Sequence, residues 1–132
     1  MKILIIDDGQ INVRDVRAAC QTVAWELVSL QPTSHIREKI ISQLEELCRK
    51  EEPFLALLDY KLWADTTGLH LVDTLKKCQI PFVGFSDYER NKALVAAGAV
   101  ESIDKNDLLA FKGFDKEKLV KFLEGVIKKL TV

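Results

Sequence analysis

Two adjacent aspartates, Asp7 and Asp8, directly follow the apolar run "KILII" (2–6), and a third aspartate, Asp59, follows the apolar run "FLALL" (54–58). Adjacent carboxylates repel one another, and a charged carboxylate is strongly disfavoured in a dry interior. A hard divalent cation such as Mg²⁺ offsets this penalty, because it prefers carboxylate oxygens, waters and phosphate as ligands. These residue types therefore point to a metal site at the end of two buried segments.

Two further polar residues end apolar runs in the same way. Ser86 ends "FVGFS" (82–86), and Lys105 follows "AVESID" (99–104). Lys105 would supply one positive charge opposite the three carboxylates, and the cation would supply the rest. In this arrangement Asp59 is the natural acceptor for an incoming charged group.

The elements that must position these residues alternate along the chain between strand-like runs and helical patterns. The predicted strands span 2–6, 25–30, 54–60, 82–86 and 99–104. The predicted helices span 11–22, 35–52, 68–78, 88–98 and 116–130. Strands that are apolar on both faces are typical of a parallel sheet covered by helices on two sides. Such sheets carry their functional residues at the carboxyl ends of the strands, so we expect all five polar residues at one edge.

Local signals set the boundaries of several helices. Ser34 is placed to cap the second helix, and Pro53 ends it. Gly98 stops the fourth helix. The last helix is amphipathic, so its lysines are interpreted as a solvated face.

The composition indicates one soluble globular domain over residues 1–132. The formal net charge is −1 and 30% of the residues are charged, so no overall field favours nucleic acid or an anionic membrane. Cys20, Cys48 and Cys78 are widely spaced and match no zinc pattern, and we expect them to be reduced thiols of a cytoplasmic protein. The apolar runs are too short for a signal peptide or a membrane span.

The order of the polar residues resembles that of the receiver domain of bacterial two-component response regulators, the CheY-like family. The resemblance rests on the Asp7–Asp8 pair, Asp59, Ser86 and Lys105, each after its own predicted strand, and it covers almost the whole chain. It implies the flavodoxin-like α/β fold, a doubly wound parallel sheet of five strands in the order 2-1-3-4-5 with helices on both faces.

The resemblance also implies a role for each residue. Asp59 would accept a phosphoryl group from a histidine kinase or phosphotransfer protein, and Ser86 and Lys105 would contact the phosphoryl oxygens. The Mg²⁺ ligands would be Asp7, Asp8, Asp59 and the backbone carbonyl of Lys61. Chemistry would be limited to self-phosphorylation and slow autodephosphorylation. The output would be contact with a downstream protein, by a monomer or weak dimer, without direct binding of nucleic acid or membrane.

Several positions depart from the family pattern. Asn106 stands where a proline usually follows the lysine, Ser102 replaces the usual aromatic switch residue, and Asp87 replaces a small residue beside Ser86. The segment "NDLLAFKGF" (106–114) lengthens the route into the last helix. These changes suggest the hypothesis of a non-standard partner or dimer contact.

Other function classes stay open. The departures favour a phosphorylation-independent, receiver-like interaction module. An enzyme of the haloacid-dehalogenase type also places an aspartate nucleophile after its first strand, but it expects D-x-D where this chain has "DDGQ" (7–10). Each polar residue alone has an ordinary structural interpretation, as a strand-end acid, a helix cap or a solvent lysine. The functional interpretation depends on all five falling at successive strand ends.

Overall fold

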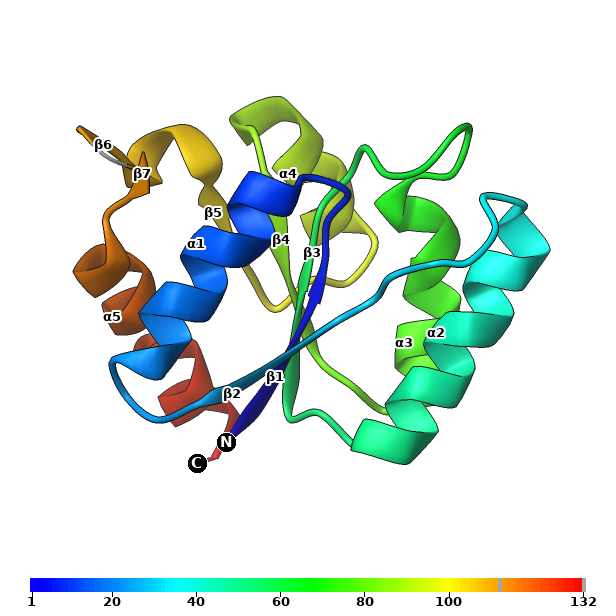
Figure 1. Ribbon diagram of the computed structural model, residues 1–132, viewed down its shortest axis with the longest axis horizontal. Coiled ribbons are helices and arrows are strands. Elements are labelled where there is room, and N and C mark those ends of the chain that lie inside the picture. The colour runs from blue at the N-terminus through cyan, green and yellow to red at the C-terminus, as the bar shows by residue number, and fades with distance from the viewer. Residues whose placement is uncertain (112, 132) are drawn as a thin grey trace.

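Five parallel strands form one sheet in the order β2-β1-β3-β4-β5, as predicted. A computed structural model describes residues 1–111 and 113–131. The strands are β1 (Lys2–Ile6), β2 (Glu26–Ser29), β3 (Leu55–Leu58), β4 (Phe82–Ser86) and β5 (Glu101–Asp104). Figure 1 shows this sheet running through the middle of the molecule, with helices on both sides. The architecture is the flavodoxin-like α/β fold that the sequence predicts.

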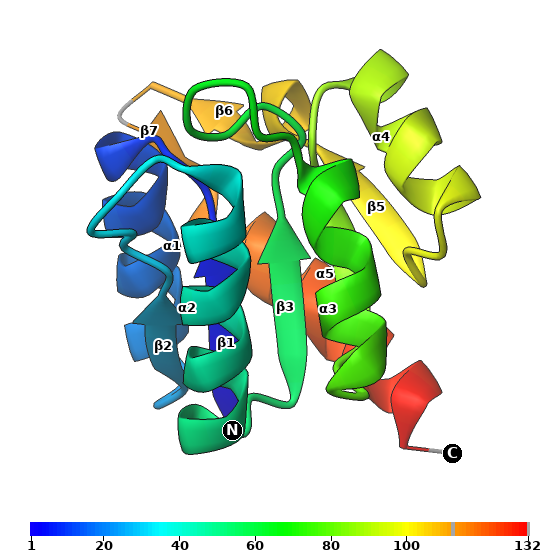
Figure 2. The ribbon, with the colours of Figure 1, turned by 90° about the vertical axis from the view of Figure 1, so that its right-hand side faces the viewer.

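Two groups of helices cover the two faces of the sheet. The helices are α1 (Gln10–Gln21), α2 (Arg37–Glu51), α3 (Val72–Lys77), α4 (Tyr88–Ala96) and α5 (Lys116–Leu130). Helices α1 and α5 pack together on one face, and α2 and α3 lie side by side on the other (Figures 1 and 2). Helix α4 packs against β4 and β5. None of the helices in the described part of the chain is long and apolar enough to cross a membrane.

The alternation of side chains along the strands divides the core into two layers. Ile3 and Ile5 of β1 belong to the apolar cluster under α1 and α5, whereas Leu4 and Ile6 belong to the cluster under α2, α3 and α4. Successive side chains of a strand point to opposite faces, so a strand covered on both sides needs apolar residues at every position. This requirement explains the uninterrupted apolar run that opens the sequence.

The prediction that Ser34 caps the second helix is wrong. Helix α2 begins at Arg37, and its N-cap residue is Ile36. The Ser34 hydroxyl instead accepts a hydrogen bond from the Ile36 backbone N–H (3.3 Å) within a turn. The Thr33 N–H donates to the Gln43 side chain (3.1 Å), which holds the preceding segment along the side of the helix and delays the helix start.

Other elements also differ from the prediction: α1, β2, α4 and β5 shift or shorten by one or two residues at an end, and larger differences lie elsewhere. The third strand covers only Leu55–Leu58, because the chain turns directly after it. The predicted helix over 68–78 is divided into a short 3-10 helix, η1 (Gly68–Leu71), and α3. A second short 3-10 helix, η2 (Lys105–Leu108), and a small hairpin of β6 (Leu109–Ala110) and β7 (Gly113–Phe114) occupy the lengthened route into α5.

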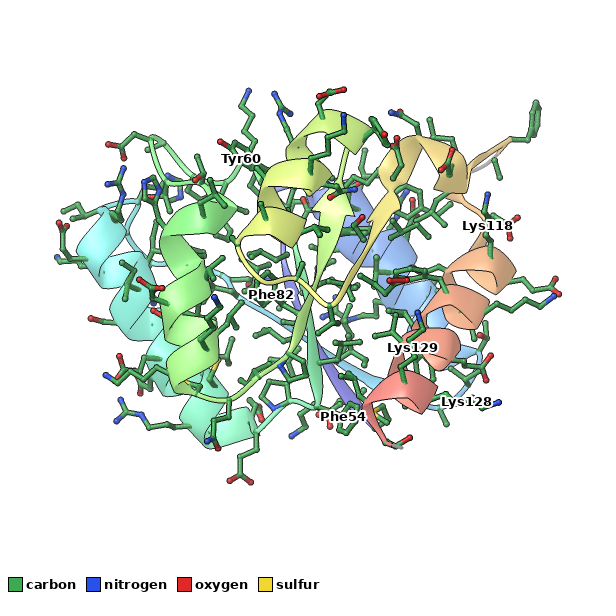
Figure 3. All side chains as sticks on the ribbon, turned by 180° about the vertical axis from the view of Figure 1, so that it is seen from behind. Phe54, Tyr60, Phe82, Lys118, Lys128 and Lys129 are labelled. Atoms are coloured by element: carbon green, nitrogen blue, oxygen red, sulfur yellow. The ribbon has the colours of Figure 1, made fainter. Side chains whose placement is uncertain are left out.

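All strands of the main sheet run in the same direction, so their carboxyl ends share one edge of the molecule. Phe54 precedes β3 and Tyr60 follows it by two residues, and Figure 3 shows these two residues at opposite ends of the molecule. The edge near Tyr60 is therefore the carboxyl edge, where the sequence predicts the functional residues.

Candidate functional site

Asp7 and Asp59 leave the sheet side by side at the carboxyl edge. The register pairs Ile5 with Leu57 across the β1–β3 ladder. Each aspartate lies two residues beyond one of these partners, so both continue the row of side chains that faces α1 and α5. Strand pairing and the two-residue repeat therefore bring the two carboxylates together from segments 52 residues apart in the chain.

Lys105 joins these two carboxylates. Its Nζ lies 2.7 Å from Asp7 Oδ2 and 2.9 Å from Asp59 Oδ2. The same Nζ lies 5.0 Å from the centre of the Phe85 ring, so the side chain crosses over β4 on its way from β5. The side chains of Asp7, Asp59 and Lys105 are 0, 9 and 20% exposed, which makes this a nearly buried charge cluster.

Asp7 is held by hydrogen bonds from the start of α1. Its Oδ1 accepts from the Gly9 backbone N–H (2.8 Å), and both of its oxygens accept from the Asn12 amide (3.3 Å each). Charge-assisted hydrogen bonds of this kind stabilise a buried carboxylate and fix its orientation. These hydrogen bonds from Gly9 and Asn12 fix the orientation of the Asp7 carboxylate without a bound ligand.

Asp59 is nearly buried, and its neighbours change its pKa in opposite directions. Burial raises the pKa of the Asp59 carboxyl above its ordinary value, the Lys105 ammonium lowers it, and the Asp7 carboxylate raises it. The Ser86 hydroxyl contributes a smaller lowering of this pKa. The net direction of the pKa shift is upward, because one lysine does not offset burial together with a second carboxylate.

A hydrogen bond from the following residue orients the Asp59 carboxylate. The Tyr60 backbone N–H donates to Asp59 Oδ1 (2.8 Å), while Lys105 contacts Oδ2. The two oxygens of the carboxylate therefore have different partners, which fixes the plane of the group.

The three aspartates are arranged as a set that could hold a metal ion. Asp7, Asp8 and Asp59 each offer a carboxylate oxygen, and these oxygens all lie within 4.8 Å of one another. Asp8 is exposed, whereas the other two are buried. Three carboxylates and one ammonium leave two negative charges, which one divalent cation would neutralise. The donor set consists of hard oxygen ligands, so it fits a hard cation.

Ser86 and Asn91 connect this cluster to the neighbouring strands. The Asn91 side chain is buried in α4 and accepts from the Ser86 backbone N–H (3.0 Å). It also donates to the backbone carbonyls of Ser86 (3.1 Å) and Ile103 (2.9 Å). One amide therefore fixes the ends of β4 and β5, from which Ser86 and Lys105 extend. Gly84 leaves room for it, because a Cβ at Gly84 would lie 2.8 Å from Asn91 Oδ1.

The loop after Asp59 returns closely to that residue. A Cβ on Gly68 would lie 2.3 Å from the Asp59 backbone oxygen, so only glycine fits there. Lys61 forms an isolated antiparallel bridge with Thr67, which places the predicted carbonyl ligand in this same short loop. The His70 ring accepts from the Thr67 N–H (2.9 Å), so this histidine caps η1.

The departures from the family pattern have local structural roles. Asp87 is the N-cap of α4 and accepts from the Arg90 N–H (2.9 Å). Asn106 begins the turn after Lys105, and its N–H donates to Asp104 Oδ1 (2.8 Å). Ser102 lines a cavity of about 330 Å³, and the other residues that line it belong to α4.

Asn12 and Asn91 are site residues that the sequence interpretation missed. Each is a polar residue within an otherwise helical, partly apolar pattern. Asn91 lies three residues before the buried Leu94, on the side of α4 that faces the sheet. A polar residue at a buried helical position is the signal that would have identified it, since a buried amide requires hydrogen-bond partners.

Comparison with known proteins gives a consistent result for the fold. No protein-family description and no curated protein matches this sequence. Many solved structures match it: the chemotaxis protein CheY4 of Vibrio cholerae is 19% identical with a TM-score of 0.67, and 95% of this chain and 97% of that chain are covered. A two-component response regulator from Clostridium difficile is 15% identical with a TM-score of 0.73, over 100% of this chain and 99% of that one.

A third match is the signal receiver domain of a modulated diguanylate cyclase from Desulfovibrio desulfuricans G20. It is 16% identical with a TM-score of 0.69, over 97% of this chain and 94% of that chain. At these identities the likeness establishes the fold. The protein has the receiver-domain, CheY-like fold, with the acidic cluster of Asp7, Asp8 and Asp59 at the carboxyl edge of its sheet.

Proposed function

We propose that this protein is a phosphoacceptor receiver domain, in which Asp59 accepts a phosphoryl group from a phosphohistidine of a partner protein. The strongest support is the position of the Lys105 ammonium between the Asp7 and Asp59 carboxylates, with Asp8 beside them. A fold needs no such concentration of buried charge for stability, because a buried ion pair is often no better than an apolar contact.

The proposed reaction is an in-line displacement at phosphorus. An Asp59 carboxylate oxygen forms a new P–O bond while the P–N bond to the donor imidazole breaks, so that the product is an acyl phosphate and a free histidine. The Tyr60 N–H holds the carboxylate in a fixed orientation for this attack. In this proposal the Lys105 ammonium and the Ser86 hydroxyl would contact the phosphoryl oxygens. Positioning and charge neutralisation are what phosphoryl transfer mainly requires of a protein.

The metal in this proposal is Mg²⁺. Asp7, Asp8, Asp59 and the Lys61 carbonyl would hold it, and Asp8 is the most accessible of the three carboxylates. When bound, Mg²⁺ supplies positive charge to the phosphoryl oxygens. The Asp7 oxygens already accept hydrogen bonds from Gly9 and Asn12 and form an ion pair with Lys105, which suits an indirect role for Asp7 through water.

The proposed partners follow from this chemistry. A histidine kinase or phosphotransfer protein would donate the phosphoryl group, and a downstream protein would bind the domain as its output. We propose a cytoplasmic monomer or weak dimer that comprises one domain over residues 1–132. Binding of nucleic acid is not part of the proposal, since the net charge of −1 gives no overall attraction to phosphate backbones.

A phosphorylation-independent interaction module is the second candidate, and one observation favours it. Ser102 stands at the position where this family usually has an aromatic residue that couples the site to the surface, and it lines a cavity beside α4. In this alternative the charge cluster is kept for structure and the surface binds its partner constitutively.

Acetyl phosphate distinguishes these two candidates. The protein is incubated with acetyl phosphate and Mg²⁺, and intact mass spectrometry measures the adduct. We expect one phosphoryl group on the wild type, strong dependence on Mg²⁺, and no adduct on Asp59→Asn. Asp65→Asn is the matched control, because Asp65 lies in the same loop with its side chain 82% exposed. A folded wild-type protein that takes up no phosphoryl group would reject the proposal in favour of the interaction module.

A further inference from the structure

A cavity of about 470 Å³ lies between α2 and α3, far from the acidic cluster. It is lined by the last turn of α2 and the end of α3, where the chain leads into β3 and β4, so it lies at the amino edge of the sheet. Figures 1 and 2 show the two helices side by side along their length. Cys48 and Cys78 both line this cavity, one from each helix.

The two thiols are neighbours with unequal access to solvent. Cys48 is 3% exposed, whereas Cys78, the C-cap residue of α3, is half-buried. Cys78 packs against the apolar cluster that contains Cys48. Burial and the adjacent Cys78 thiol raise the pKa of Cys48 to about 12, so Cys48 is a weak nucleophile on its own.

The third cysteine cannot take part in this pair. Cys20 is buried in α1, within the cluster on the opposite face of the sheet. The sheet separates it from both residues of the cavity. Cys20 is only 1% exposed, so a low-molecular-weight disulfide has no access to it in the folded protein, and no second cysteine lies on its face of the sheet in the described part of the chain. Cys20 therefore provides an internal control.

We propose that Cys48 and Cys78 are a redox-active pair that closes to an intramolecular disulfide in the presence of a low-molecular-weight disulfide. Cys78, the accessible thiol, reacts first, and Cys48 then displaces the small thiol from it. Two thiols at the facing ends of two helices, at the wall of an open cavity, provide both the access and the proximity that this exchange requires.

The exchange balances in two steps. The Cys78 thiolate attacks one sulfur of oxidised glutathione, a Cys78–glutathione bond forms, and one glutathione leaves as its thiolate, which takes up the proton that Cys78 lost. Cys48 then attacks the Cys78 sulfur, the Cys48–Cys78 bond forms, and the second glutathione leaves with the Cys48 proton. The protein dithiol is oxidised and one glutathione disulfide is reduced to two thiols.

The link would join the carboxyl-terminal ends of α2 and α3 and close a loop through β3 and the Asp59 segment. A cross-link across a long loop restricts the unfolded chain, so oxidation should raise the urea midpoint of unfolding. The pair lies at the opposite edge of the sheet from the acidic cluster. The inference is therefore independent of the proposed phosphoryl chemistry, and either can fail without the other.

The test is incubation of the folded, reduced protein with oxidised glutathione, followed by non-reducing peptide mapping. We expect a peptide that links Cys48 to Cys78, no glutathione retained on the protein, and an unmodified Cys20. Cys20→Ser should give the same link. Glutathione retained on Cys78 of the wild type, a link to Cys20, or no reaction at either cavity cysteine would overturn the proposal.

Two variants separate the roles of the cysteines. Cys48→Ser should trap a stable mixed disulfide on Cys78, because the displacing thiol is gone. Cys78→Ser should leave Cys48 unmodified and should abolish the oxidation-dependent rise in the urea midpoint. If Cys48→Ser fails to fold, the wild-type map and Cys78→Ser still decide the question. Equal glutathione labelling of Cys48 in Cys78→Ser would show that accessibility does not order the two steps, contrary to the proposal.

Discussion

Two lysines at opposite edges of the same sheet each contact two carboxylates, yet their surroundings differ. Lys2, at the amino edge, lies 3.7 Å from Glu26 and 3.2 Å from Glu51, and these three side chains are 29, 66 and 26% exposed. Lys105, at the carboxyl edge, contacts Asp7 and Asp59 at 2.7 and 2.9 Å in a nearly buried cluster. Each lysine thus pairs with two carboxylates, but the pairs at the amino edge are partly exposed to solvent and those at the carboxyl edge are nearly buried.

The comparison indicates that burial, more than the number of partners, decides what a charged group can do. Exposed pairs are screened by solvent and salt and contribute little to stability. Buried charges depend strongly on each partner, and removing one leaves the others unpaired. The interactions at the carboxyl edge should therefore change when a single charge is added there, as the proposed phosphorylation would do.

Removing the buried lysine should have the largest effect. We expect Lys105→Met to lower the free energy of unfolding by about 3 kcal/mol at neutral pH, because two buried carboxylates lose their shared cation. Lys105 lowers the pKa of Asp59, so in the variant that carboxyl takes up a proton more readily as the pH falls. The deficit should therefore shrink as the pH falls below neutral. Urea titrations at several pH values measure it, and a deficit independent of pH would contradict the electrostatic explanation.

The neutral hydrogen bonds of the carboxyl edge should have the next largest effect. Asn91→Ala leaves a buried N–H and two carbonyls without this partner, and we expect a loss of about 2 kcal/mol. Urea unfolding measures the loss, with the exposed Lys92→Ala in the same helix as the control. Hydrogen exchange should increase at the ends of β4 and β5. A variant as stable as the wild type would show that charge alone organises this edge.

Neutralising Asp59, the proposed acceptor, should have a smaller effect of the opposite sign. Because the pKa of Asp59 is raised in the folded state, its charged form destabilises the native protein at pH values above that pKa. Asp59→Asn should therefore increase the free energy of unfolding at pH 7, by on the order of 1 kcal/mol. The gain should disappear as the pH falls and the wild-type carboxyl becomes protonated. If Asp59→Asn is less stable than the wild type without Mg²⁺, the charged Asp59 carboxylate does not destabilise the folded protein, which would contradict this prediction.

The lysine at the amino edge should have the smallest effect, because its partners are more exposed than those of Lys105. Hydrogen bonding to Glu51 raises the pKa of Lys2, so its contribution is present at neutral pH and is lost above its ordinary pKa of 10.5. Lys2→Met should lower the urea midpoint far less than Lys105→Met, and added salt should remove the difference from wild type. Equal decreases of the urea midpoint in Lys2→Met and Lys105→Met would contradict the view that burial makes the lysine at the carboxyl edge more important for stability.

The strand order and the approximate positions of the strands and helices could be predicted because the signals are local and repeated. The apolar run over 2–6, the run over 82–86 and the amphipathic pattern over 116–130 match β1, β4 and α5 residue for residue. Apolar strands alternating with helices leave few arrangements other than a doubly wound parallel sheet. The position of polar residues after these strands then located the carboxylates and the lysine at one edge.

The features that the sequence did not predict depend on contacts between residues that are not neighbours in the chain. The delayed start of α2 follows from the Thr33–Gln43 hydrogen bond rather than from a local cap. The β6–β7 strands are two residues each, too short for a two-residue repeat to be visible. Asn12 and Asn91 are ordinary helix residues in the sequence, and their roles exist only once the strand ends are assembled around them.

The most direct test of the central claim is to locate the modified residue. After treatment with acetyl phosphate and Mg²⁺, borohydride reduction converts an acyl phosphate to an alcohol that peptide mapping can assign. We expect reduction at Asp59 alone, with Asp7, Asp8 and Asp65 unchanged. Reduction at any other carboxylate, or none in a folded and Mg²⁺-bound protein, would contradict it.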